Sequence, residues 1–194
     1  MSTDTSEKGL ELLILRSLTG LTDAQILEKP GGSGGVGEGA GGYGSAGYVL
    51  GRAEDYDRDH AVDLPKLLAF LQSTQPLAFE TLKLGTEGPG RLQFLNRLQG
   101  EIAKRGIVDV LRKGVAHGPA MVQLFYGTPS PGNNKAKALW EANILSVTRQ
   151  LHYSKDQAQL ALDLALFVNG LPLATFELKN RLTKQTVEDA VEQY

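Results

Sequence analysis

The sequence predicts an α/β fold in which a central mixed β-sheet is flanked by helices. Leucines recur at helical spacing in the first half of the chain, as over Leu64–Leu71. Residues Leu145–Tyr153 instead alternate between apolar and polar side chains, which is typical of a strand with one buried face. Two apolar runs then flank Asn169-Gly170, a pair that favours a tight hairpin turn. At 194 residues the chain fits a single domain, 1–194, with its own core.

The helices are expected from spacing and from capping residues. A first helix begins after Ser6, which suits an N-cap. Its buried stripe is expected to consist of four apolar residues at helical spacing: Leu10, Leu13, Ile14 and Leu18. Further helices are expected after Asp63, over Arg91–Arg105 up to Gly106, and over residues 135–143.

A glycine-rich stretch, Gly31–Gly51, contains 11 of the 23 glycines. It includes Gly42-x-Gly44-x-x-Gly47, which formally matches the dinucleotide-binding pattern, but no strand precedes it and no amphipathic helix follows. We therefore interpret the stretch as a flexible loop, and nucleotide binding at Gly42–Gly47 is kept as an alternative.

The central sheet is expected to contain four strands: Met121–Tyr126, Leu145–Tyr153, Leu160–Val168 and Leu173–Asn180. After them, Val187–Tyr194 has helical spacing without a stop signal. We therefore expect the chain to be a fragment of a longer protein.

Three charged residues interrupt the two apolar runs of the hairpin: Asp163, Glu177 and Lys179. Ionised groups are seldom buried unless they are paired or bind a metal. Glu177 and Lys179 are two apart, so they share a face of their strand, and Leu178 between them offers a backbone carbonyl. A regular two-residue turn would place Asp163 on the opposite face. We therefore predict a three-residue turn or a β-bulge that brings Asp163 to the same face.

The chemistry of this trio favours a hard divalent cation. Two carboxylates about 4 Å apart repel by roughly 4 kcal/mol at an effective dielectric of about 20, and a cation reverses that repulsion. The chain has no cysteine and three scattered histidines, so a carboxylate site for Mg2+ or Mn2+ is expected. Such a site suits phosphodiester hydrolysis, with Lys179 orienting the attacking water or neutralising charge. The alternative is a buried Asp–Lys ion pair with Glu177 at the sheet edge.

Other charged residues have open interpretations. Arg149 interrupts an apolar face and is either a snorkelling arginine or a clamp for phosphate or carboxylate. Glu7 suits a helix first turn through the helix dipole, and a metal-facing role is the alternative. Six basic residues in Arg91–Lys113 could meet a phosphate backbone. From charge alone we interpret them as a solvated helix face.

The segments "LDLALFVNGLPLATFELKN", "ANILSVTRQLHYS" and "QTVEDAVEQY" together resemble the N-terminal nuclease region of type I restriction enzyme R subunits, members of the PD-(D/E)xK nuclease superfamily. The likeness extends to "LLAFLQSTQPLAF" and "GIVDVLRKGV" and is weakest in Gly31–Gly51. It implies a restriction-endonuclease-like core. Leu162 stands where the superfamily motif has proline.

The resemblance implies roles for the site residues. Asp163, Glu177 and Lys179 would be catalytic, with Asp163, Glu177 and the Leu178 carbonyl binding Mg2+ or Mn2+. Glu7 is the candidate for a first-helix glutamate that completes the metal site. Gln193 occupies the position of a glutamine motif in the following helix, and Arg149 is an auxiliary DNA-contacting candidate.

The resemblance also implies partners. The full subunit would translocate and cleave double-stranded DNA with ATP, through motor domains absent from this chain, and would dock on methylase and specificity subunits. A catalytically inactive DNA-binding or docking module is the rival hypothesis. No apolar run approaches the roughly 18 residues of a membrane span, so no membrane partner is expected. The N-terminus lacks a secretion signal, so a cytoplasmic location is expected.

Overall fold

The computed structural model describes residues 6–28, 47–157 and 159–179. The chain divides into two compact units. Unit 1 comprises residues 1–53, 146–166 and 174–194, and unit 2 comprises 54–145 and 167–173. None of the helices among the described residues has the length and apolar character needed to cross a membrane.

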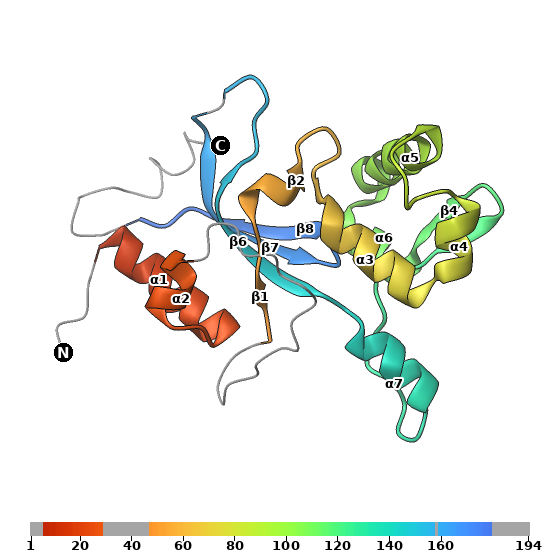
Figure 1. Cartoon of the computed structure of the whole chain (residues 1–194), viewed down its shortest axis with the longest axis horizontal. Helices are drawn as coiled ribbons and strands as arrows, with labels where there is room; N and C mark the ends of the chain where they lie inside the picture. The colour runs from red at the N-terminus through yellow and green to blue at the C-terminus, as the bar shows by residue number, and fades with distance from the viewer. Residues whose placement is uncertain (1–5, 29–46, 158, 180–194) are drawn as a thin grey trace. The chain divides into compact units, whose positions relative to one another are not determined.

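The described elements are labelled in Figure 1. Unit 1 contains α1 (Glu7–Thr19), α2 (Asp23–Glu28) and β1 (Val49–Leu50), with most of β6 (Leu145–His152) and β7 (Ala161–Val168) and the second half of β8 (Leu171–Phe176). Unit 2 contains β2 (Tyr56–Asp57), β3 (Val62–Asp63), α3 (Leu64–Thr74), α4 (Pro76–Thr81), α5 (Pro89–Arg105), α6 (Ile107–Lys113), β4 (Val115–His117), β5 (Ala120–Val122) and α7 (Asn134–Glu141). A 3-10 turn, Ala53–Asp55, joins the two units.

The main sheet has four strands in the order β1-β6-β7-β8. Strand β1 runs parallel to β6, with Val49 opposite Ser146, whereas β7 and β8 form a hairpin, so the sheet is mixed. The α/β class and the mixed sheet are therefore confirmed. Of the glycine-rich stretch, residues 31–46 lie outside the described residues, and Val49–Leu50 form β1.

The predicted strand Met121–Tyr126 is wrong as a member of the main sheet. Only Ala120–Val122 form a strand, β5, which pairs with β4 in a separate two-stranded sheet. Beyond it, side-chain amides take the place of a neighbouring strand: those of Gln75, Asn143 and Asn169 bond the backbone of residues 123–126. Residues 123–126 therefore do not pair with another strand, because side-chain amides already form hydrogen bonds with their backbone N–H and C=O groups.

The hairpin turn explains why an asparagine is buried in unit 2. Asn169 and Gly170 have φ values of +52° and +79°, as a type I′ turn requires. The fully buried Asn169 side chain accepts from Ile144 N at 2.6 Å and donates to Leu124 O at 2.8 Å. At Gly170 a Cβ would lie 2.4 Å from Asp63 O, so only glycine fits.

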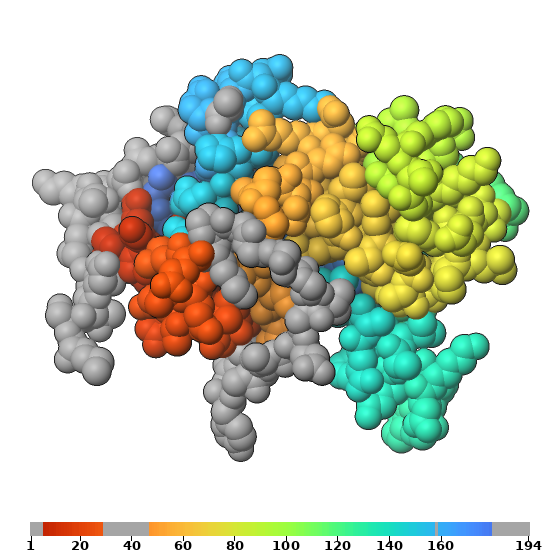
Figure 2. Space-filling view, viewed as in Figure 1, coloured from red at the N-terminus to blue at the C-terminus, as the bar shows by residue number. Residues whose placement is uncertain are grey.

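Each unit has its own apolar core. In unit 2 the core is formed around Phe70 and Phe94 from α3 and α5. In unit 1 it contains Leu15 and Ile26 from the helices and Val147 and Leu164 from the sheet. Helices α1 and α2 lie side by side and their side chains are visible at the surface in the space-filling view (Figures 1 and 2).

The first helix begins as predicted, and half of its predicted stripe packs inward. Ser6 caps it by accepting a hydrogen bond from Gly9 N at 3.1 Å. Ile14 and Leu18 pack partly buried against the unit 1 core, whereas Leu10 and Leu13 are exposed. The fully buried positions are Glu11, Leu15 and Thr19. The stripe was wrong at Leu10 and Leu13 because apolar spacing does not reveal that a charged residue, Glu11, is paired inside the unit.

Candidate functional site

Asp163 lies on β7 in unit 1 and is half-buried. Its Oδ2 accepts a hydrogen bond of 2.7 Å from the backbone N–H of Leu178. Leu178 follows the end of β8 at Phe176, so residues 177–179 lie outside the strand. The Asp163 carboxylate therefore takes the N–H that a continuing ladder would have used, and this contact brings the two segments together.

Of the two predicted irregularities, a three-residue turn or a β-bulge, the hairpin does not have the three-residue turn. The turn has two residues, Asn169 and Gly170, between β7 and β8. The prediction of a longer turn is wrong. The departure from regular pairing lies at the far end of the hairpin, where β8 stops at Phe176 and Leu178 bonds the side chain of Asp163. The predicted strand Leu173–Asn180 is correspondingly shorter at its C-terminal end.

Glu177 shows that the three predicted charged groups lie close together. Burial raises the pKa of Glu177, and the negative charge of Asp163 raises this pKa further, whereas the positive charge of Lys179 lowers it. A side-chain hydrogen bond with Asp163 also contributes to the raised pKa of Glu177. The Asp163 carboxylate thus opposes the ionisation of Glu177, and the lysine offsets only part of that effect.

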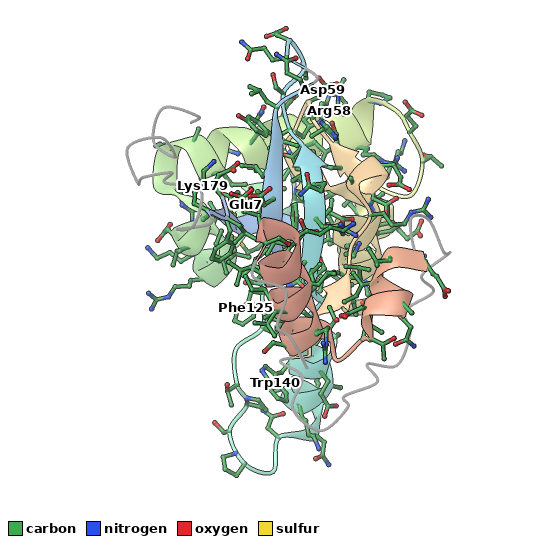
Figure 3. The ribbon with its side chains drawn as sticks, turned by 90° about the vertical axis from the view of Figure 1, so that its left-hand side faces the viewer. Glu7, Arg58, Asp59, Phe125, Trp140 and Lys179 are labelled. Carbon is green, nitrogen blue, oxygen red and sulfur yellow. The ribbon has the colours of Figure 1, made fainter. Side chains whose placement is uncertain are left out.

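Glu7 lies in the first turn of α1 and is exposed. Figure 3 shows its side chain in the same region as Lys179, and its charge adds slightly to the raised pKa of Glu177. Across the described ranges, however, no group of three His, Cys, Asp or Glu residues is arranged to hold a metal. The geometry thus brings Glu7 near the site without making it a third carboxylate ligand.

The remaining donor set fits a hard cation. Asp163 and Glu177 supply carboxylate oxygens, and the Leu178 carbonyl was predicted as a third oxygen donor. Mg2+ commonly takes one or two carboxylates and fills the rest of its octahedron with water and substrate oxygens. A cation between the two carboxylates would also relieve the repulsion that raises the pKa of Glu177. The residues present therefore fit Mg2+ or Mn2+, while their metal-binding and catalytic roles stay predictions.

Arg149 pairs with a carboxylate from the protein itself. Its Nε lies 2.6 Å from Oε1 of Glu11, whose side chain is almost completely buried. The angles at this contact are not those of a hydrogen bond, although the distance makes it an ion pair. Arg149 therefore holds a carboxylate, as one of its two interpretations proposed, and this carboxylate is that of Glu11. DNA contact by Arg149 stays a prediction.

Two residues of this region escaped the sequence reasoning: Glu11 as a buried group, and Gln150. Gln150 Nε2 donates to Glu11 Oε2 at 2.9 Å and lies 3.3 Å from Asp163 Oδ1. Strand alternation places Arg149 and Gln150 on opposite faces, so no local pattern indicates that both contact Glu11. The predicted auxiliary residue Gln193 lies outside the described residues, as do Gly42 and Gly44 of the alternative nucleotide site.

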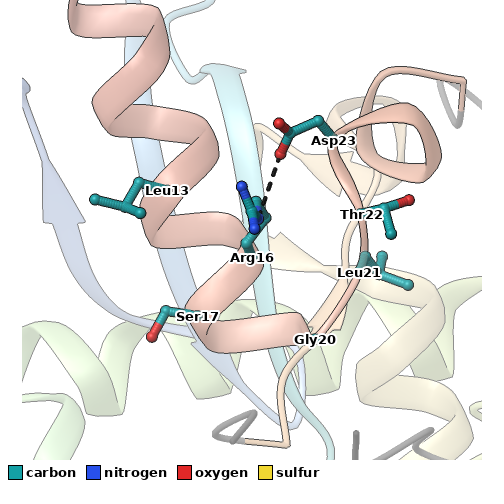
Figure 4. A pocket seen from close by; sticks show the side chains of 7 residues that line it. All are labelled: Leu13, Arg16, Ser17, Gly20, Leu21, Thr22 and Asp23. Carbon is teal, nitrogen blue, oxygen red and sulfur yellow. Dashed lines mark ion pairs between the residues drawn. The ribbon is translucent and has the colours of Figure 1, made fainter. Parts of the chain in front are cut away.

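A pocket of about 520 Å3 lies between α1 and α2 in unit 1 (Figure 4). It is lined by Leu13, Arg16, Ser17, Gly20, Leu21, Thr22 and Asp23. Arg16 Nε is 3.5 Å from Asp23 Oδ1 across this pocket, and both side chains are about half exposed. None of the predicted site residues lines this pocket.

Three of the six basic residues in the segment Arg91–Lys113 of unit 2 form ion pairs. Arg97 and Arg105 both contact Glu101, and Arg105 and Lys113 both contact Asp109. These pairs are spaced i, i+4 along the helices. They support the interpretation as a solvated helix face over that of a phosphate-binding patch.

The fold and the site define a mixed α/β protein with paired carboxylates and a lysine beside the end of an edge strand. Residues 101–194 match the family described as type I restriction enzyme R protein N terminus. The predicted resemblance to that restriction-enzyme family is therefore confirmed over these residues. The match includes Asp163, Glu177 and Lys179, whereas α1 and the segment "LLAFLQSTQPLAF" precede it. Neither curated proteins nor solved structures gave a match.

Proposed function

We propose that this chain is the Mg2+-dependent endonuclease region of a type I restriction R subunit, with a PD-(D/E)xK core, and that it hydrolyses phosphodiester bonds of double-stranded DNA. Mn2+ would substitute for Mg2+. The observation that supports it is that Asp163 and Lys179 both act on the charge of Glu177, while Asp163 accepts a hydrogen bond from the neighbouring Leu178 N. The family match over residues 101–194 supports the restriction-system context.

The roles follow from the chemistry of each residue. Asp163, Glu177 and the Leu178 carbonyl would hold the cation, which would supply Lewis acidity toward a phosphate oxygen. Lys179 would orient the attacking water and offset negative charge that develops on the phosphate. The hydrogen bond from Leu178 N keeps the Asp163 carboxylate beside Glu177, which limits the reorganisation needed for cation binding.

The setting of the reaction is proposed from the family. In the complete R subunit, cleavage would be coupled to ATP-dependent translocation of DNA by motor domains, and the subunit would assemble with methylase and specificity subunits in the cytoplasm. This chain would supply the cutting chemistry alone.

Plasmid cleavage with Mg2+ tests the proposal. Asp163→Ala and Lys179→Ala should each lower the rate by about 100-fold or more, because each removes a group that acts on the reacting phosphate. Asp156→Ala and Lys8→Ala remove exposed charges of the same types in unit 1 and should leave the rate unchanged. Cleavage that persists in both site variants would end the assignment. Binding of duplex DNA without any cleavage by the wild type would favour the inactive-module alternative.

A further inference from the structure

A chain of polar contacts, buried at Glu11 and exposed at Gln150, connects α1, β6 and β7 within unit 1. It begins at Glu11, which is 4% exposed. One oxygen of Glu11 is paired with Arg149 at 2.6 Å, and the other accepts from Gln150 at 2.9 Å. The chain ends at Asp163, whose Oδ1 lies 3.3 Å from the same Gln150 nitrogen. A residue of the proposed nuclease site is thus connected to a helix that precedes the matched family region.

The amide of Gln150 is suited to bridge two carboxylates. Its NH2 group carries two hydrogens, so Nε2 can donate one to Glu11 and one to Asp163. The reversed amide would place its oxygen against two negative oxygens, so these neighbours fix its orientation. Hydrogen bonds to charged acceptors are stronger than those between neutral groups. The bridge therefore holds the two carboxylates in a defined relation.

The backbone of Gln150 is strained in a way that serves this bridge. Its φ is +47°, a conformation that costs a residue other than glycine roughly 1–3 kcal/mol. In a regular strand Arg149 and Gln150 would point to opposite faces. The positive φ breaks the alternation, so both side chains reach Glu11. Such local irregularities commonly re-aim side chains beside functional sites.

Asp163 is consequently held from both sides. Gln150 bonds Oδ1 and Leu178 N bonds Oδ2, which fixes the plane of the carboxylate. Arg149 and Gln150 contact the two oxygens of Glu11, the first as an ion pair and the second as a hydrogen bond. No group of three carboxylates is placed to hold a metal among the described residues.

We propose that Gln150 is a positioning residue that sets the cation affinity of the site by fixing Asp163, with Glu11 and Arg149 holding Gln150 in place. The inference rests on the proposed nuclease function. Groups that orient a metal-ligating side chain typically change metal affinity or activity by 10–100-fold when they are replaced. Gln150 makes the corresponding contact to Asp163.

Mn2+ binding to the full chain, measured by titration calorimetry without DNA, tests this inference. Gln150→Met keeps the size of the side chain and removes its donors, so the affinity for Mn2+ should fall about 10–100-fold. Gln150→Gly also removes the donors but relieves the positive φ, so it should lose affinity while its melting temperature without metal equals or exceeds that of wild type. Gln157→Met alters an exposed glutamine of the same unit and should bind as wild type.

The outcomes distinguish failure of the proposed metal site from failure of the positioning role of Gln150. Asp163→Ala should abolish Mn2+ binding, and if it binds as tightly as wild type the proposed metal site itself fails. If Asp163→Ala abolishes binding while both Gln150 variants stay within twofold of wild type, only the positioning role is overturned. If Gln150→Met fails to fold, the Mn2+ affinity of Gln150→Gly alone tests the positioning role.

Discussion

Glu11 in unit 1 and Asp63 in unit 2 are both buried carboxylates paired with a base, yet their partners differ in kind. Asp63 is bonded three residues away: Lys66 Nζ lies 2.6 Å from Oδ2, and Lys66 N donates to Oδ1 at 3.2 Å. Glu11 is instead held by β6, and Gln150 is 139 positions away in sequence. The Asp63 carboxylate caps a helix locally, whereas the Glu11 carboxylate connects segments that are distant in sequence.

This difference separates structural from site-related burial. The printed hydrogen bonds of the Asp63 carboxylate both go to Lys66 at the start of α3, so the burial of this carboxylate is explained by the helix that it caps. The partners of Glu11 lead on to Asp163, a residue of the proposed nuclease site. The degree of burial alone does not distinguish these carboxylates, whereas the residues to which they are hydrogen-bonded do.

Arg149→Met is expected to have the largest effect on stability. It leaves Glu11 buried without a countercharge, which typically costs about 3–5 kcal/mol. Urea unfolding measures the loss, and hydrogen exchange of peptides from α1 locates it. Arg97→Met is the matched control, because Arg97 is half exposed and its pair should contribute no more than about 1 kcal/mol. Equal losses in the two variants would show that Glu11 needs no long-range countercharge.

Asp63 provides the second, smaller test. Asp63→Ala removes the N-cap of α3 and should cost about 0.5–2 kcal/mol at neutral pH. Asp63→Asn keeps a capping side chain without a charge, so it isolates the effect of ionisation.

The pH dependence of this pair has a definite sign. Burial raises the pKa of Asp63 above its ordinary value of 3.8, although Lys66 opposes the shift. The folded protein therefore binds this proton more tightly than the unfolded chain does, and the contribution of Asp63 to stability falls as pH rises from 3.8 through the raised pKa. The melting temperature of wild type relative to Asp63→Asn should be higher at pH 4 than at pH 7. A difference that is constant or reversed would contradict the raised pKa.

Local sequence signals predicted much of the sheet. Alternation located β6, and the Asn169-Gly170 pair located the hairpin, because both depend on neighbouring residues only. Met121–Tyr126 failed because amides from Gln75, Asn143 and Asn169 replace a strand partner there. No local pattern contains those distant donors.

The candidate residues of the site could be chosen from the sequence, whereas their connections could not. Asp163, Glu177 and Lys179 stood out as charges in apolar runs, and Asp163 and Lys179 lie close enough to Glu177 to act on its pKa. The connection through Gln150 depends on one positive φ and on a glutamate in another helix. Side-chain spacing in a strand assumes regular backbone, so it could not reveal either.

Ser6→Ala gives the smallest expected effect and tests what holds α1 in place. Ser6 is exposed and caps the helix through Gly9 N at 3.1 Å, so its loss should cost about 0.5–1 kcal/mol. Hydrogen exchange should accelerate in the first turn of α1, while Mn2+ affinity stays unchanged, because the Glu11–Gln150 contact lies in a later turn. Ser17→Ala, at an exposed position of the same helix, should be neutral or slightly stabilising. If Ser6→Ala instead costs as much stability as Arg149→Met, the local cap contributes as much to α1 as the long-range pairing of Glu11. Unit 1 would then not differ from unit 2, where Asp63 caps its helix locally.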